Sequence, residues 1–243
     1  MRSMAADRQK RYRERNQDRH RKEDATRKRQ NRRTKPFVMW DGEGCRDTGY
    51  SLFGSSEGDA ICYPDLSTYE CLSLILECEA RIPDAIHFGF AFDYDVNMIL
   101  KDLSWRHLNL LRKRGKTVWN DFTITHIPGK WFTVKQGDVF AKIYDVFSFF
   151  GCSYYNALEQ YQTGTQRERD FILAGKKRRD LFMYSQINAI RDYWHTELRL
   201  GPLLMDYIRE VLDNAGYPIH SWHGPGALAR YELNRRKIRK CMK

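Results

Sequence analysis

Paired cysteines, long apolar runs and a secretory leader are all missing from this chain of 243 residues. Its six cysteines form no Cys-x-x-Cys pair, which argues against a zinc ribbon or a disulfide framework. No apolar stretch approaches the ~18 residues that a membrane span needs. The N-terminus lacks the apolar core of a signal peptide. We therefore expect a soluble, cytoplasmic protein with no membrane partner.

The excess positive charge is concentrated at the N-terminus. Of the net charge of +11, residues 1–35 carry +10, from 15 Lys+Arg and 5 Asp+Glu. This segment has no Val, Ile, Leu, Phe or Trp, so it cannot bury enough apolar surface to offset its ordering entropy. We expect a disordered or helical basic arm over 1–35 that contacts the phosphates of nucleic acid; the alternative is a solubilising tail without a partner. Its candidate contacts are Arg27, Lys28, Arg29, Arg32 and Arg33.

From residue 36 onward the pattern changes to strands that alternate with helices. Ser67 with Glu70 three residues later is a capping box, which predicts a helix over 67–82. Apolar residues at helical spacing predict a long helix within 184–216, with a kink at Pro202. Strands are predicted at 36–42, 50–55, 60–64 and 85–92 and within 116–150. This order favours an α/β fold with a mixed sheet over 36–216, followed by an extension over 217–243.

Two of the predicted strands deliver acidic residues. Asp41 and Glu43, in "WDGEG", stand at the end of the first strand, and Asp93 and Asp95 follow the strand at 85–92. Clustered carboxylates are costly unless cations neutralise them, and oxygen ligands favour Mg²⁺ or Mn²⁺. The period of two sends Asp41 and Glu43 to the same side, and Gly42 between them would let a substrate backbone approach. A lone Asp-x-Glu is also common at solvated strand ends, so the pattern needs further partners.

A third acid and a basic run complete the set of candidate residues. Tyr193 and Glu197, in "YWHTE", share one helix face because they are four residues apart; alone, such a pair is typical of a helix surface. The run "GKKRR" offers phosphate contacts, although solvated charge explains it equally well. Its candidates are Lys176, Lys177, Arg178 and Arg179. His87 is expected in the core, and His195 and His223 lack metal-ligand spacing.

The ordered set "WDGEG", "FAFDYDVNMIL" and "YWHTE" resembles the three exonuclease motifs of family B DNA polymerases, particularly the protein-primed-like branch of phages and mobile elements. Two further segments, "KIYDVFSFFGCSYYNALEQY" and "GYPIHSWHGPGALAR", are similar to the same branch. The resemblance implies a ribonuclease-H-like fold and a proofreading-type 3′→5′ exonuclease that acts on single-stranded or frayed 3′ ends of DNA. It also implies two Mg²⁺ or Mn²⁺ ions held by Asp41, Glu43, Asp95 and Glu197, with Tyr193 orienting the attacking water.

Three departures from the family pattern stand out. Glu197 replaces the usual Asp, Phe90 and Ala91 occupy the region of an expected Asn, and Asp93 competes with Asp95 for the second motif. We prefer Asp95, because "YDVNMIL" continues as the apolar helix that follows this acid in the family. Nothing resembles the polymerase palm motif, so DNA synthesis by this chain alone is not expected. The alternatives are a piece of a split or truncated polymerase that acts with a separate palm-bearing chain, and a non-catalytic nucleic-acid-binding module.

Overall fold

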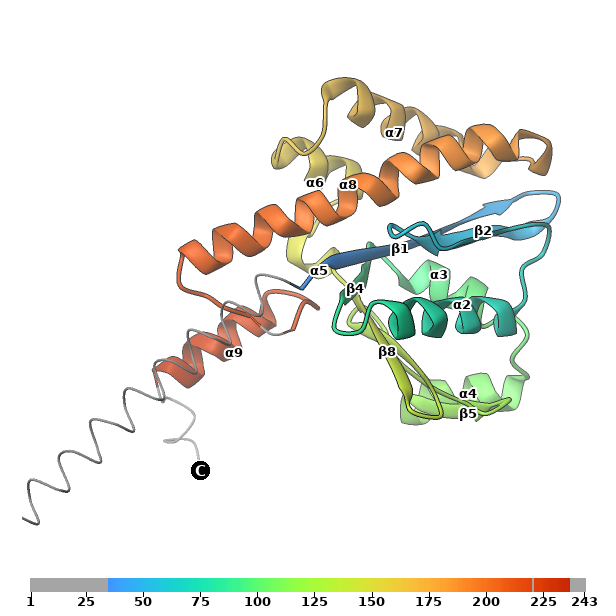
Figure 1. Cartoon of the computed structure of the whole chain (residues 1–243), viewed down its shortest axis with the longest axis horizontal. Coiled ribbons are helices and arrows are strands. Elements are labelled where there is room, and N and C mark those ends of the chain that lie inside the picture. Colours follow the sequence, from blue (N-terminus) through green and yellow to red (C-terminus); the bar gives the residue numbers. More distant parts are fainter. Residues whose placement is uncertain (1–34, 220, 237–243) are drawn as a thin grey trace, which may run out of the picture. The chain divides into compact units, whose positions relative to one another are not determined.

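The computed structural model describes residues 35–219 and 221–236 (Figure 1). The predicted basic arm, with all five of its candidate phosphate contacts, lies outside the described residues apart from its last residue. The strands are β1 (Phe37–Cys45), β2 (Gly49–Ser55), β3 (Ala60–Cys62), β4 (Ile86–Gly89), β5 (Lys116–Trp119), β6 (Phe122–Ile127), β7 (Trp131–Gln136) and β8 (Val139–Asp145). The α-helices are α2 (Thr68–Arg81), α3 (Asp93–Ile99), α4 (Trp105–Arg114), α5 (Phe147–Phe150), α6 (Tyr154–Gln160), α7 (Gln166–Arg178), α8 (Ile187–Asn214) and α9 (Gly226–Arg235).

The strands form one eight-stranded mixed sheet in the order β3-β2-β1-β4-β8-β7-β6-β5. β1, β4 and β8 run parallel to one another, whereas β2 and β3 on one side and β7, β6 and β5 on the other are joined antiparallel. Helices flank this sheet (Figure 1). The predicted α/β class with a mixed sheet is confirmed, and the arrangement is consistent with a ribonuclease-H-like fold.

Strand β1 lies between two apolar cores, because alternate side chains of a strand point to opposite faces. Val38 and Trp40 belong to the core that includes α2, and Phe37 and Met39 belong to the core that includes α8. Figure 1 shows α2 and α8 on opposite sides of β1. Asp41 continues the odd-numbered series, so the chain delivers it to the face that α8 covers.

Helix α8 packs closely on β1 through small and hydrogen-bonding residues. A Cβ atom at Gly201 would lie 2.1 Å from the sulfur of Met39, so only glycine lets the helix approach this near. The indole of Trp194 donates a hydrogen bond to the backbone oxygen of Asp41 at 3.0 Å. These contacts place the third motif opposite the first, although the two are more than 150 residues apart in the chain.

Several element boundaries differ from the sequence predictions. β1 runs on to Cys45, with an irregularity in its pairing between Glu43 and Gly44, so its acids lie inside the strand and not at its end. β4 stops at Gly89, and Ala91 follows with φ of 57°, a left-handed conformation that ends a strand. The capping box of Ser67 is confirmed. α8 is assigned as one continuous helix through Pro202.

The C-terminal part of the described chain returns to the sheet. Trp222 is buried, and its ring meets that of Phe37 edge-on with centroids 4.9 Å apart. This contact ties the segment before α9 to the start of β1. Within residues 35–219 and 221–236, no helix has both the length and the apolar character needed to cross a bilayer.

Candidate metal centre

Three carboxylates meet between β1 and α8. Oxygen atoms of Asp41, Glu43 and Glu197 all lie within 4.8 Å of one another. Glu43 and Glu197 are buried, and Asp41 is partly buried. We call these three residues the acidic cluster. Such a set of oxygen ligands could hold a metal ion, and it brings together residues of the first and third predicted motifs.

Asp41 has a carboxylate oxygen that no described group satisfies. Its Oδ2 atom is buried and has no hydrogen-bond partner among the described residues. A buried acceptor without a partner costs about 1–3 kcal/mol, and more when it is charged. The donor set is therefore all oxygen, incomplete and shielded from water, which fits a hard divalent cation better than it fits a purely structural role.

Arg179 supplies the positive charge that the acidic cluster needs in this structure. Its Nη2 atom donates to Oε1 of Glu43 at 2.8 Å, to Oε2 of Glu197 at 3.2 Å and to the hydroxyl of Tyr193 at 3.1 Å. Lys176 adds a weaker contact, with its Nζ 3.9 Å from Oε1 of Glu197. The two basic residues thus neutralise part of the cluster and leave the Oδ2 atom of Asp41 unpaired.

Burial raises the pKa of two acids of the cluster, Asp41 and Glu43. Desolvation raises the pKa of Glu43 to about 8, although the charge of Arg179 acts in the opposite direction. The pKa of Asp41 also lies well above its ordinary value, first because of burial and then because of the charges of Glu197 and Asp95. Burial lowers the pKa of Arg179, but Glu43 and Glu197 outweigh this effect and keep the guanidinium charged. A cation bound beside Asp41 and Glu43 would favour their ionised forms.

Asp95 lies beside the acidic cluster on another element. It is buried in the first turn of α3, and its Oδ1 accepts a hydrogen bond from the hydroxyl of Tyr50 at 2.8 Å. Burial raises its pKa to about 7, although the hydrogen bond from Tyr50 opposes this shift. Its oxygens do not join the three mutually close ligand atoms of the acidic cluster. Its assignment as a metal ligand stays a prediction.

Two expectations around Asp95 can be compared with the contacts. Asp93 accepts hydrogen bonds from the ring of His126 at 2.9 Å and from the backbone of Gly129 at 3.0 Å, which gives it a structural role at the start of α3. The expectation that Gly42 leaves room for a substrate is wrong. A Cβ at Gly42 would lie 1.9 Å from the hydroxyl of Tyr50, so this glycine makes room for the tyrosine.

The structure locates His87 in the core and spreads the residues of the basic run between the surface and the acidic cluster. His87 is a core residue, as expected: it is buried, and its Nδ1 accepts a hydrogen bond from Trp40 at 2.9 Å. Of the basic run, Lys177 and Arg178 are exposed, whereas Arg179 is engaged by the carboxylates. Contact of these residues with phosphates stays a prediction.

Sequence reasoning missed Tyr50 as a partner of Asp95, and it missed that Arg179 contacts the carboxylates of Glu43 and Glu197. Tyr50 is 45 residues from Asp95 and belongs to no motif, so no local pattern points to their hydrogen bond. Arg179 is one of four successive basic residues, and only the turn after α7 decides which of them faces the acids. The two acids of the first motif, Asp41 and Glu43, were the signal in the sequence that a positive charge could lie beside them.

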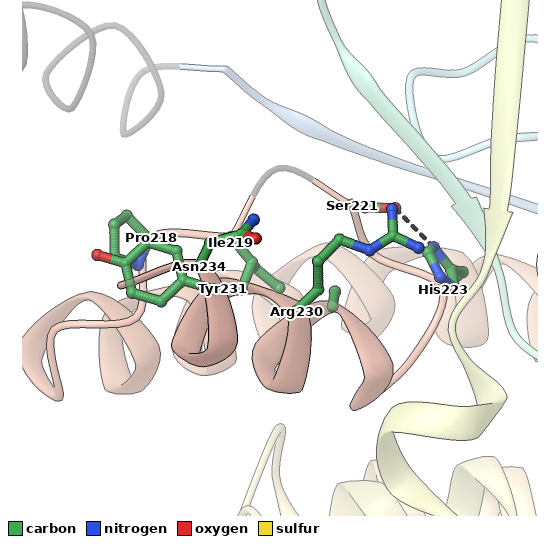
Figure 2. A pocket seen from close by; sticks show the side chains of 8 residues that line it. Pro218, Ile219, Ser221, His223, Arg230, Tyr231 and Asn234 are labelled. Carbon is green, nitrogen blue, oxygen red and sulfur yellow. Dashed lines mark hydrogen bonds between the residues drawn. The ribbon is translucent and has the colours of Figure 1, made fainter. Parts of the chain in front are cut away.

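A cavity lies in the C-terminal part of the described chain. It has a volume of about 210 Å³ and is lined from α9 and the segment before it (Figure 2). The hydroxyl of Ser221 and Nδ1 of His223 are 2.5 Å apart there. None of the described residues that line it is acidic. This cavity therefore offers no carboxylate ligands for a hard cation.

The chain matches no protein-family model, no curated protein and no solved structure. Its likeness to the polymerase exonucleases therefore rests on the motifs in the sequence, and the buried acidic cluster rests on the structure.

Proposed function

We propose that this chain is a metal-dependent nuclease that hydrolyses phosphodiester bonds, acting as a 3′→5′ exonuclease on DNA. The observation that carries the proposal is the meeting of Asp41, Glu43 and Glu197 within 4.8 Å, with a buried carboxylate oxygen left unpaired. The motif order and the fold, which is consistent with the ribonuclease-H-like class, support the same reading. Two Mg²⁺ or Mn²⁺ ions are the proposed cofactors, with Asp95 as the fourth ligand.

Each side chain has a distinct task in this proposal. Asp41, Glu43 and Glu197 hold the cations, which when bound neutralise phosphate charge and polarise the phosphoryl oxygens as Lewis acids. Tyr193 stays protonated, because burial and then the charge of Glu197 raise the pKa of its hydroxyl. It therefore acts by orienting groups through hydrogen bonds, not as a base. Trp194 holds β1 and α8 together through the backbone of Asp41.

In this proposal a bound cation replaces Arg179 as the positive partner of Glu43 and Glu197. Its guanidinium bonds the oxygens of Glu43 and Glu197 that a cation would need, so it has to release them when a cation binds. Because it extends from the turn after α7 and is only partly buried, it can then turn toward the phosphate of a substrate. Arg179 would thus neutralise the carboxylates when no cation is bound and contact the substrate phosphate when a cation is bound.

The engagement of Arg179 also favours a second candidate, a nucleic-acid-binding module without catalysis. In that case the guanidinium would be the permanent partner of Glu43 and Glu197, and divalent ions would not bind. Metal titration separates the two candidates. Isothermal calorimetry with Mn²⁺ should show saturable binding that Asp41→Asn weakens at least about tenfold, since one ligand is lost. Absence of binding by the parent would reject the nuclease.

A further inference from the structure

The ring of Tyr193 also lines a cavity of about 400 Å³ between α7 and the start of α8. Its apolar lining is made by one face of α7, by Phe182 and by the first turns of α8. The apolar residues are Phe171, Ala174, Gly175, Phe182, Ala189, Ile190 and Tyr193. Cavities of ~300–1,000 Å³ with mostly apolar walls and a few polar groups are typical of small-ligand sites.

Aromatic rings form the walls of this cavity. Phe171 and Phe182 each meet Tyr193 edge-on, with centroids 6.5 Å and 6.0 Å away. Phe171 is 44% exposed, which leaves its ring open to a ligand. Flat rings that border an open space suit a flat aromatic ligand, which can stack on one of them.

Polar side chains without partners stand at the opening. Arg178, Ser185, Gln186 and Asn188 are exposed and line the cavity, and none of their side chains makes a hydrogen bond or ion pair with another described residue. The two amides each offer donors and acceptors, as the edge of a nucleobase does. The guanidinium of Arg178 suits a phosphate. The ligand they fit together is flat, has a hydrogen-bonding edge and carries negative charge.

We propose that this cavity binds one unpaired nucleobase of a nucleic-acid strand, with the adjacent phosphate at Arg178. The connection of this base site to phosphodiester cleavage rests on the proposed function. The Tyr193 hydroxyl bonds Arg179 at 3.1 Å beside the acidic cluster, while its ring borders the cavity, so a single side chain connects the two. A base held in a duplex cannot enter a space between two helices, and the strand must therefore be single or frayed there.

Ala189→Phe tests the proposal, because its side chain would fill the cavity from an exposed position without overpacking the core. The probes are a 5′-labelled oligothymidylate and an abasic strand of the same length, about ten nucleotides, since stacking sites span a few bases. Fluorescence anisotropy with the full chain in EDTA measures binding without cleavage. Ala80→Phe, at an exposed position of α2, is the matched control. Phe171→Ala is a second variant that opens the wall instead of filling it.

The parent should bind the oligothymidylate at least about fivefold more tightly than the abasic strand, since stacking of one base is worth that much. Ala189→Phe and Phe171→Ala should remove this preference and leave abasic binding unchanged, and Ala80→Phe should keep it. Equal binding of both strands by the parent overturns the proposal. So does an Ala189→Phe variant that keeps the preference, as expected if the cavity takes an apolar side chain of a protein partner. A variant that weakens both strands alike overturns it too.

The outcome is separable from that of the proposed nuclease. Base-dependent binding that Ala189→Phe removes, in a protein that cleaves no strand, keeps the base site and rejects the nuclease. Cleavage that depends on Asp41, with no effect of Ala189→Phe on binding, does the reverse.

Discussion

Asp41→Asn tests whether the acids of β1 lie in the core to hold a cation. The substitution keeps the side-chain volume and removes an ionisable carboxyl group from a cluster in which oxygens of Glu43 and Glu197 lie within 4.8 Å. The Oδ2 atom of Asp41 has no partner that could be lost. An amide there would add a donor among acceptors. In EDTA we therefore expect the variant to be as stable as the parent, or more stable by up to about 1–3 kcal/mol.

Divalent cations should reverse this ranking. A ligand at 100 times its dissociation constant stabilises the folded parent by about 2.7 kcal/mol. For a domain of this size that corresponds to a rise in Tm of about 5–10 °C. The variant should lose most of this rise, because it lacks one of the three close ligands. If the chain is the proposed nuclease, the variant should also fail to cleave DNA.

The assay is thermal and urea unfolding of both proteins in EDTA and in millimolar Mn²⁺. Asp192→Asn, on an exposed position of α8 one residue before Tyr193, controls for the loss of a negative charge without loss of a ligand. A structural role for Asp41 gives the opposite sign: the variant would be less stable than the parent in EDTA by about 1–3 kcal/mol. That result, together with an unchanged Mn²⁺ shift, would refute the reasoning.

Three further predictions follow from the same site. Because the pKa of Glu43 is raised from 4.5 to about 8, the folded state binds more protons than the unfolded state, and the free energy of unfolding in EDTA should fall by up to ~5 kcal/mol as pH rises across this range. Urea unfolding at pH 5 and pH 9 measures this fall, which should be smaller in Asp41→Asn than in the parent. An equal fall in both proteins would contradict the prediction. Arg179→Gln should lower stability in EDTA by about 1–3 kcal/mol, since Glu43 and Glu197 lose their partner. It should nevertheless enlarge the Mn²⁺-induced rise in Tm, because Arg179 no longer competes with the cation for the carboxylates. Lys177→Gln, at an exposed position, is the control, and a smaller Mn²⁺-induced rise would contradict the replacement of Arg179 by a cation. Under the proposed function, Glu197→Asp should keep cleavage because it keeps the carboxylate, and Glu197→Gln should lose it. Retained cleavage by Glu197→Gln would remove Glu197 from the metal site.

Local patterns were sufficient for the parts of the fold that local interactions decide. In the capping box, the side chains of Ser67 and Glu70 each accept a hydrogen bond from the other residue's backbone N–H. Both residues lie within four positions of the sequence, so the start of α2 could be predicted. The period of two places Asp41 and Glu43 on one side, and the spacing of four places Tyr193 and Glu197 on one helix face.

Tertiary contacts decided what the sequence could not. The left-handed conformation of Ala91 ends β4 early, and no residue-type signal announces it because alanine rarely adopts it. The space beside Gly42 is filled by Tyr50, a residue on the neighbouring strand. Arg179 reaches the acids only because α7 ends where it does. No periodicity in the sequence encodes these features.

The most direct test of the account is incubation of the full chain with a 5′-labelled single-stranded DNA oligonucleotide and Mg²⁺ or Mn²⁺. The acidic cluster predicts a ladder of shortened, 5′-labelled products that EDTA abolishes and that Asp41→Asn does not form. A labelled strand that stays intact with either metal, or one that the parent and Asp41→Asn shorten at the same rate, would contradict the claim that these buried carboxylates hold catalytic cations.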